Sequence, residues 1–220
     1  YERSIAIDPS YAEPYARLAR VHTYPWITGL RTSREESLDT ALRLARRSVE
    51  LDAELAVAQG MLSWVCAWSG LHDEAVPAAR RSVVLDPGGA ESHYWLGVSL
   101  SCSGFNHEAE RELILAMRYD PHCPVYYLWA RAQNYLFMRR YADAIELAEQ
   151  AVRMAPTFVG GYVVLTTSHA LTGRTDDARR MAKELTRLFP GYCEHRRQVS
   201  IGYKPELADI YREGMKRIGL

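Results

Sequence analysis

The stretch Val83-Val84-Leu85-Asp86-Pro87 decides the fold of this 220-residue chain, because variants of it recur at nearly constant spacing. The copies end at Pro9, Ala53, Pro87, Pro121, Pro156 and Pro190, so the successive intervals are 44, 34, 34, 35 and 34 residues. A period of 34 residues is that of a repeated helix–turn–helix unit. Each such unit buries its apolar face only against its neighbours, so the period predicts an all-α solenoid.

Small side chains stand at two fixed distances before each marker. Twelve residues before it are Ala41, Ala75, Ala109, Ala144 and Ala178, and five before it are the small residues Ser48, Ser82, Ala116 and Ala151 and the apolar Leu185. Small residues at these positions allow the two helices of a unit to pack closely. Gly70, Gly104 and Gly173 each precede a polar, partly acidic stretch. They predict the turn between the two helices, and the marker proline predicts the end of the second helix.

Together these features resemble tetratricopeptide-repeat (TPR) proteins over about residues 1–191. The resemblance implies a single domain, a right-handed α-solenoid of helix–turn–helix repeats with a C-terminal capping helix. We expect a second helix of a truncated repeat (1–11), a repeat with an insertion (12–55), the repeats 56–89, 90–124, 125–158 and 159–191, and a cap (192–220). Apolar residues at helical spacing after Pro205 predict that the cap contains a helix over 205–218. Because the chain begins inside a repeat, we expect it to be the C-terminal part of a longer protein.

Three residues depart from the repeat pattern. Pro77 falls in the second helix of its repeat, and we expect it to be tolerated near the start, where amide hydrogens lack helical partners. Arg131 replaces a leucine typical of the family, and Arg139 replaces the turn glycine. The fourth repeat is therefore expected to be the least regular, with its extra residue placed before Val125.

The first interval exceeds the period by ten residues, which we place in a loop near residues 24–30. Trp26, Ile27 and Leu30 make this loop too apolar to lie loose in water. It either packs locally over the first repeat or forms a second contact surface through Trp26.

This insertion and the C-terminal residues 203–220 indicate a narrower group within the TPR proteins. Together they are similar to the C-terminal TPR region of bacterial class III adenylate/guanylate cyclases, and winged-helix transcriptional regulators share much of it. In such proteins the catalytic or DNA-binding domain lies upstream, and the repeats regulate it or recruit partners. None of those upstream motifs is in this chain, so the resemblance assigns no catalytic residue.

In TPR proteins the first helices of successive repeats line a concave groove that binds peptides or helices. Carried onto this sequence, the family's groove positions include Arg20, Trp64, Tyr94, Tyr126, Trp129 and Gln133. The lysine and asparagine that clamp a terminal carboxylate in chaperone-binding members are absent, with Ala16, Arg20, Gly60 and Trp64 in their places. Aromatic and arginine side chains dominate binding hot spots, so we expect an apolar peptide or amphipathic helix. The alternative for each aromatic residue is a role in the core, which we favour for Trp68 and Trp95.

Composition argues against several classes of function. Lys+Arg and Asp+Glu both total 27, so no net charge attracts nucleic acid or an anionic membrane, and no apolar stretch is long enough to span one. The four cysteines form no CxxC pair, which indicates small core residues in a reducing, cytosolic setting. No metal-ligand, phosphate-loop or nucleophile motif occurs, and we expect neither a metal, a cofactor nor catalysis.

The pattern therefore predicts a non-catalytic protein-interaction or regulatory module. Its partner is either a separate protein or peptide, or the upstream domain of the same chain. The other candidate class is a scaffold that drives self-association of the parent protein as a homo-oligomer.

Overall fold

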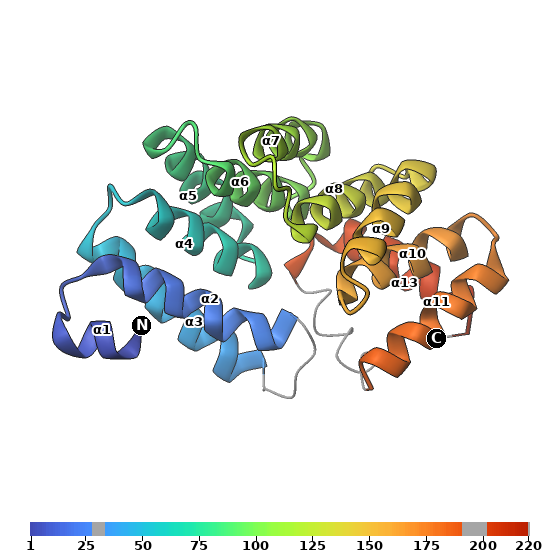
Figure 1. The fold of residues 1–220 in the computed structure, drawn as a ribbon, viewed down its shortest axis with the longest axis horizontal. Coiled ribbons are helices and arrows are strands. Elements are labelled where there is room, and N and C mark those ends of the chain that lie inside the picture. The colour runs from blue at the N-terminus through green and yellow to red at the C-terminus, as the bar shows by residue number, and fades with distance from the viewer. Residues whose placement is uncertain (28–33, 191–201, 220) are drawn as a thin grey trace.

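The computed structural model describes residues 1–27, 34–190 and 202–219, and the side chains of these residues except 24–27, 34 and 35. It is built of paired antiparallel helices stacked side by side (Figure 1). The first helices of the pairs are α2 (Ala12–Ile27), α4 (Ala56–Trp68), α6 (Ala90–Cys102), α8 (Val125–Phe137) and α10 (Val159–Leu171). The second helices are α1 (Glu2–Ile7), α3 (Arg34–Leu51), α5 (His72–Leu85), α7 (Asn106–Tyr119), α9 (Tyr141–Met154) and α11 (Thr175–Leu188). The expected α-solenoid is confirmed.

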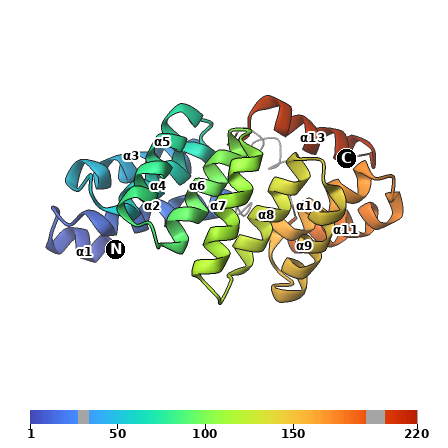
Figure 2. The same ribbon diagram turned by 90° about the horizontal axis from the view of Figure 1, so that it is seen from above.

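Successive first helices pack against one another and form the inner wall, and the second helices form the outer wall (Figure 2). The alanines expected between the helices of a pair, such as Ala75 and Ala144, are fully buried. Where serine takes the second small position, it also makes a hydrogen bond across the pair: Ser48 Oγ donates to the Ala12 carbonyl at 2.8 Å. Close helix packing therefore follows from the small residues, as the sequence predicts.

The turns between paired helices end each first helix with one left-handed residue. Gly70, Gly104 and Gly173 have φ values of 78°, 82° and 77°, and Arg139 takes the same role with φ 59°. At each of these turns the amide of the following residue bonds back to a carbonyl in the last turn of the helix, as for Arg140 N–H and the Tyr135 carbonyl at 2.9 Å. The irregularity expected in the fourth repeat therefore lies at Arg139, which adopts the left-handed backbone conformation that glycine adopts in the equivalent turns.

The remaining departures from the repeat are also accommodated. α5 continues through Pro77, which is exposed and lies one turn further into the helix than the sequence suggested. The extra residue of the 35-residue interval lies before Val125, in the turn where Cys123 has a φ of 42°. Both features leave the stacking of the repeats intact.

The insertion in the first repeat differs from the loop expected over 24–30. α2 continues as helix to Ile27, and α3 begins at Arg34, so part of the insertion lengthens both helices. The prediction failed because the apolar residues at 24–27 continue the helix instead of opening a loop. Residues 28–33 lie outside the described part of the chain.

The predicted C-terminal helix is present as α13 (Pro205–Lys216). It covers the last repeat from the inner wall, where it packs against α10 and α8 (Figures 1 and 2). Its apolar residues Leu207, Ile210, Tyr211 and Met215 are buried, as their helical spacing predicts. The solenoid thus has an inner wall that its own C-terminal helix partly covers.

Candidate protein-interaction surface

The N-terminal half of the inner wall carries a line of aromatic rings. Trp64 on α4, Tyr94 on α6 and Tyr126 on α8 follow one another with ring centroids 5.7 Å and 5.0 Å apart. Trp64 and Tyr126 are partly buried, whereas Tyr94 is only 5% exposed. This burial raises the pKa of both tyrosine hydroxyls, strongly so for Tyr94. The rings thus form a largely apolar floor with two of its three members accessible.

Two arginines of α2 reach over this floor toward one carboxylate. Arg20 lies 5.8 Å above the centre of the Tyr126 ring and 3.2 Å from a carboxylate oxygen of Glu91. Arg17 approaches the other oxygen of Glu91 at 3.4 Å and also pairs with Glu13. Burial alone would lower the pKa of Arg17, but these two carboxylates raise it above its ordinary value. The Arg20 side chain is 44% exposed, so its guanidinium is accessible for a further acceptor.

The C-terminal part of the expected groove is buried. Trp129 is 7% exposed because its ring stacks on Trp68 at 6.2 Å and meets the edge of Phe158. Gln133 is 2% exposed, and its side-chain oxygen accepts a hydrogen bond of 3.1 Å from the hydroxyl of Tyr203. Both residues lie on the inner wall as expected but present little surface to an external partner in this structure.

The sequence did not show that residues 202–204 return to the inner wall. Tyr203 packs against Trp68 and Phe137, with centroid distances of 5.7 Å and 5.1 Å, and the Lys204 amide donates to the Cys102 carbonyl at 3.2 Å. The sequence offered one signal of this close packing, a glycine shortly before the predicted helix (Gly202) and another inside it (Gly214). Trp68 and Trp95 are core residues, 1% and 3% exposed, as expected.

The possible contact through Trp26 lies outside the described side chains, because only the backbone of this residue is placed, in the last turn of α2.

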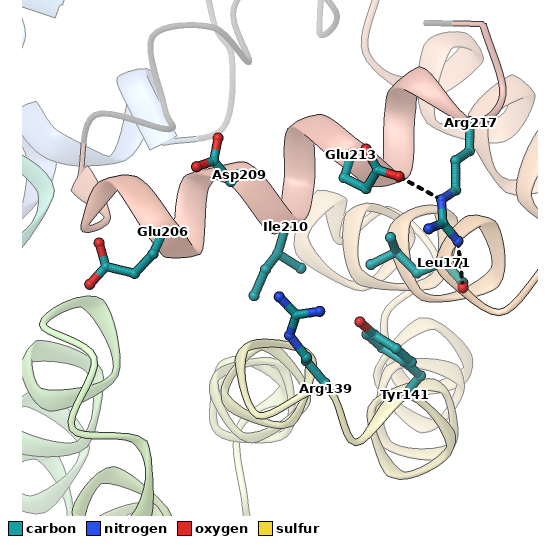
Figure 3. Close-up of a pocket in the computed structure, with 8 residues that line it drawn as sticks. All are labelled: Arg139, Tyr141, Leu171, Glu206, Asp209, Ile210, Glu213 and Arg217. Carbon is teal, nitrogen blue, oxygen red and sulfur yellow. Dashed lines mark hydrogen bonds and ion pairs between the residues drawn. The ribbon is translucent and has the colours of Figure 1, made fainter.

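A pocket of about 170 Å³ lies between α13 and the ends of α8 and α10 (Figure 3). Its charged lining consists of Glu206, Asp209, Glu213, Arg139 and Arg217. Arg217 is engaged, since it pairs with Glu213 at 2.8 Å and donates to the Leu171 carbonyl at 2.9 Å. With Tyr141, Leu171 and Ile210 completing the lining, the pocket offers no nucleophile paired with a base.

The arginines of the outer wall pair with acids of the neighbouring repeat. Arg46 meets Glu74 at 3.0 Å and Arg80 meets Glu108 at 2.7 Å. Exposed pairs of this kind are typical of a solvated helix face.

The described cysteines are core residues rather than reactive thiols. Cys66 and Cys102 are buried, and burial raises the pKa of each thiol to about 12. Cys123 is partly buried, which also raises the pKa of its thiol. Within residues 1–27, 34–190 and 202–219, no group of three or more His, Cys, Asp or Glu side chains could hold a metal ion. Over the same residues, no helix has the length and apolar character needed to cross a membrane.

Comparison with known proteins places this geometry in a structural class. No protein-family model and no curated protein matches the chain. Among solved structures, TTC0263, a thermophilic TPR protein in Thermus thermophilus, superposes with a TM-score of 0.68 at 18% identity, covering 87% of this chain and 98% of that one. The type IV pilus biogenesis factor PilW gives 0.65 at 15% identity, covering 94% and 88%.

YrrB, described as a TPR protein with an unusual peptide-binding site, gives a TM-score of 0.53 at 15% identity and covers 88% of this chain and 94% of that chain. Such identities show the fold alone. The fold of this chain is that of a tetratricopeptide-repeat α-solenoid.

Proposed function

We propose that this chain is a non-catalytic protein-interaction module that binds a peptide or an amphipathic helix along the inner wall of α2, α4, α6 and the first turn of α8. The observation that carries the proposal is the line of Trp64, Tyr94 and Tyr126 with Arg20 beside it, on the part of the wall that lies away from α13. Aromatic rings and arginine supply much of the binding energy at protein interfaces, because aromatic rings bury a large area with few rotatable bonds and the guanidinium of arginine makes several directed hydrogen bonds.

The chemistry of this surface selects its ligand. Trp64 and Tyr126 offer apolar area, and Arg20 provides a partly exposed cation that is held by Glu91 in the absence of a ligand. A ligand with one or two large apolar side chains and a nearby carboxylate satisfies both features, the carboxylate taking over Arg20 from Glu91. The peptide-binding site described for YrrB supports a peptide ligand for a solenoid of this fold.

The wider setting rests on the sequence resemblance. The chain would be the C-terminal, cytoplasmic part of a bacterial signalling protein, a class III cyclase or a winged-helix regulator, with the upstream domain or a separate protein as partner. Reading the coding sequence upstream of Tyr1 tests this directly. An upstream region with neither a cyclase domain nor a winged helix removes this part of the proposal and leaves the interaction function standing.

Selection of peptides from a displayed random library, with the folded chain as bait, tests the binding function. Selected peptides are expected to combine aromatic or aliphatic residues with an acid, and to bind a Trp64→Ala/Tyr126→Ala variant at least about tenfold more weakly. A Tyr119→Ala variant is the matched control, since Tyr119 is 49% exposed at the end of α7 on the outer wall. Equal loss in both variants, or no loss in either, contradicts the assignment of the inner wall.

Self-association is the second candidate function, favoured by apolar side chains exposed on the second helices of the repeats. Val84 on α5 is 68% exposed and Met154 on α9 is 52% exposed. Light scattering over a range of concentrations separates the two functions. A mass that rises with concentration and falls back in a Val84→Ser/Met154→Ser variant supports self-association, and a monomer throughout excludes it.

A further inference from the structure

Residues 202–217 lie on the inner wall in the manner of a bound helix. In α13 the side chains of Leu207, Ile210, Tyr211 and Met215 are between 1% and 7% exposed. The opposite face of the same helix carries the exposed charges of Glu206, Asp209, Arg212, Glu213 and Lys216. An apolar stripe in a groove with a charged face in water is the arrangement by which helical grooves hold a separate amphipathic helix.

An aromatic anchor precedes the helix. Tyr203 is 6% exposed in a cluster with Trp68, Phe137 and Tyr211, and its hydroxyl donates to Gln133. The backbone of Lys204 is fixed to α6 through the Cys102 carbonyl at 3.2 Å. The segment therefore contacts α4, α6 and α8 before α13 reaches α10, which is how a peptide ligand spans successive repeats.

Two glycines set how closely the segment approaches the wall. A Cβ at Gly214 would lie 2.7 Å from Thr167 Cγ2 and 3.2 Å from both the Cα and the carbonyl oxygen of Thr167. A Cβ at Gly202 would lie 3.2 Å from the Cα and the carbonyl oxygen of Trp68. Backbone atoms cannot move aside as a flexible side chain can, so the groove requires a ligand without a side chain at both positions.

The contact is tight along one side of α13 and open along another. The pocket of about 170 Å³ separates α13 from Arg139 and Tyr141 at the α8–α9 turn, and charged side chains line it (Figure 3). At its C-terminal end α13 is held to α10 by the hydrogen bond from Arg217 to the Leu171 carbonyl. An apolar stripe that packs into the wall, with charged side chains along its edge, matches the apolar centre and polar rim of a protein interface.

We propose that the inner wall from the C-terminal ends of α4 and α6 across α8 to α10 is a helix-binding groove in which residues 202–217 are the resident ligand, and that a partner helix of the same pattern displaces them. The pattern is an aromatic residue at the Tyr203 position, glycine one position before it and eleven positions after it, and apolar residues four, seven, eight and twelve positions after it, as read from this segment. The surface is distinct from the line of Trp64, Tyr94 and Tyr126, so this proposal does not rest on the proposed function.

The tether sets how strongly the resident segment competes. A segment in the same chain acts at an effective concentration on the order of millimolar, so an external helix of equal intrinsic affinity is largely excluded at micromolar concentration. Releasing the resident segment raises the fraction of open groove, and the apparent affinity for an external helix rises in proportion.

Fluorescence anisotropy with a labelled synthetic peptide of residues 202–219 tests the proposal on the full chain. The Gly214→Val variant, whose new side chain meets the Thr167 backbone, is expected to bind this peptide at least about tenfold more tightly than the unmodified chain. Lys216→Val is the matched control, because it places the same side chain on the exposed face of α13 and is expected to leave the peptide affinity unchanged. A peptide carrying Gly214→Val itself is expected not to bind.

A second variant covers the case in which Gly214→Val fails to fold. Tyr203→Phe/Arg217→Gln removes the hydrogen bonds to Gln133 and Leu171 without adding volume, and is expected to raise the peptide affinity in the same direction by a smaller factor. A folded variant of either kind that binds the peptide no better than the unmodified chain overturns the proposal. Loss of the helical circular dichroism signal in both variants also overturns it, because residues 202–217 are then an integral part of the fold.

Discussion

The line of Trp64, Tyr94 and Tyr126 leaves two of its three rings partly exposed, and we call this part of the inner wall the open half. The covered half lies beneath residues 202–204, which contact the ends of α4 and α6, and beneath α13, which packs on α8 and α10. Trp64 and Trp129 illustrate the difference. Both occupy groove positions on first helices of identical length, but Trp64 remains partly exposed and Trp129 is buried against Trp68.

The repeat geometry therefore builds a continuous wall, and a segment outside the repeats decides which part of it is open. Trp68 marks the boundary, because its ring contacts Trp64 of the open half, Trp129 of the covered half and Tyr203 of the covering segment. Substitutions in the open half, in the covered half and at this boundary should therefore have different effects.

The largest effect is expected in the reactivity of two buried thiols on the inner helices. Cys66 on α4 and Cys102 on α6 have pKa values raised by burial from 9.0 to about 12, so near neutral pH the reactive thiolate is about a thousandfold rarer than in the unfolded chain. Alkylation by iodoacetamide at pH 8, followed residue by residue with mass spectrometry, should be slow at both and fast in urea. Fast alkylation of the native chain would mean that the inner helices are not closely packed around these thiols.

The same thiols make stability depend on pH in a defined direction. The folded chain keeps two protons that the unfolded chain releases above its ordinary thiol pKa, so the unfolded state binds fewer protons in that range. The free energy of unfolding should therefore fall as the pH rises from 9 toward 12, and be insensitive to these thiols below that window. Urea titrations compared with a Cys66→Ala/Cys102→Ala variant, whose slope should be flatter, measure this contribution.

Substitution at the boundary should cost more stability than substitution in the open half. Trp68 is 1% exposed and contacts both halves, so Trp68→Ala should lower the free energy of unfolding by about 3–5 kcal/mol. Trp64→Ala removes a partly exposed ring and should cost roughly 1–2 kcal/mol. Urea denaturation followed by circular dichroism gives both values, and similar losses would refute the distinction between an open and a covered half.

The third and fourth repeats are joined by a partly buried ion pair. Glu110 on α7 accepts hydrogen bonds of 2.6 Å from both Arg131 and the Tyr135 hydroxyl on α8. Glu110→Gln keeps the shape but leaves Arg131 poorly matched, so the free energy of unfolding should fall by about 1–3 kcal/mol. Glu108→Gln, which breaks the more exposed pair with Arg80, is the control and should cost less than about 1 kcal/mol.

Replacing Arg139, which has a left-handed backbone conformation and faces α13, should increase the stability of the fold. Arg139 has φ 59° where the equivalent turns have glycine, and a non-glycine residue in this region costs roughly 1–2 kcal/mol. Arg139→Gly should therefore raise the free energy of unfolding by about 0.5–1 kcal/mol, after the greater freedom of glycine in the unfolded chain is subtracted. The reverse substitution, Gly104→Arg at φ 82°, should lower the thermal midpoint.

The sequence period predicted most of this fold, because the same turn residues and the same small packing residues recur in each repeat. The 34-residue marker placed the helix pairs, the small residues placed their contacts, and the missing glycine at Arg139 correctly identified the irregular turn. The scattered cysteines predicted core residues, and Cys66 and Cys102 are buried.

Two features were beyond reach of the sequence. The docking of α13 depends on contacts between residues far apart in the chain, such as Tyr203 with Gln133 and Gly214 with Thr167, and no period relates them. The insertion was misjudged because a helix that simply continues past its usual end has the same apolar composition as a packed loop. Local sequence patterns therefore predicted the helices of the inner wall, whereas the docking of residues 202–217 on that wall could be seen only in the tertiary structure.

The smallest effect on stability is expected at Glu91, in the open half. Its pairs with Arg17 and Arg20 are partly exposed, so Glu91→Gln should change the free energy of unfolding by less than about 1 kcal/mol. The same change frees Arg20 for an external carboxylate, and acidic peptides selected on the inner wall should bind more tightly by a margin that shrinks with added salt. Stronger binding with unchanged stability would show that Glu91 competes with the ligand for Arg20. Weaker binding would show that Glu91 holds Arg20 in place over Tyr126. The binding surface of the open half would then be preorganised for its ligand.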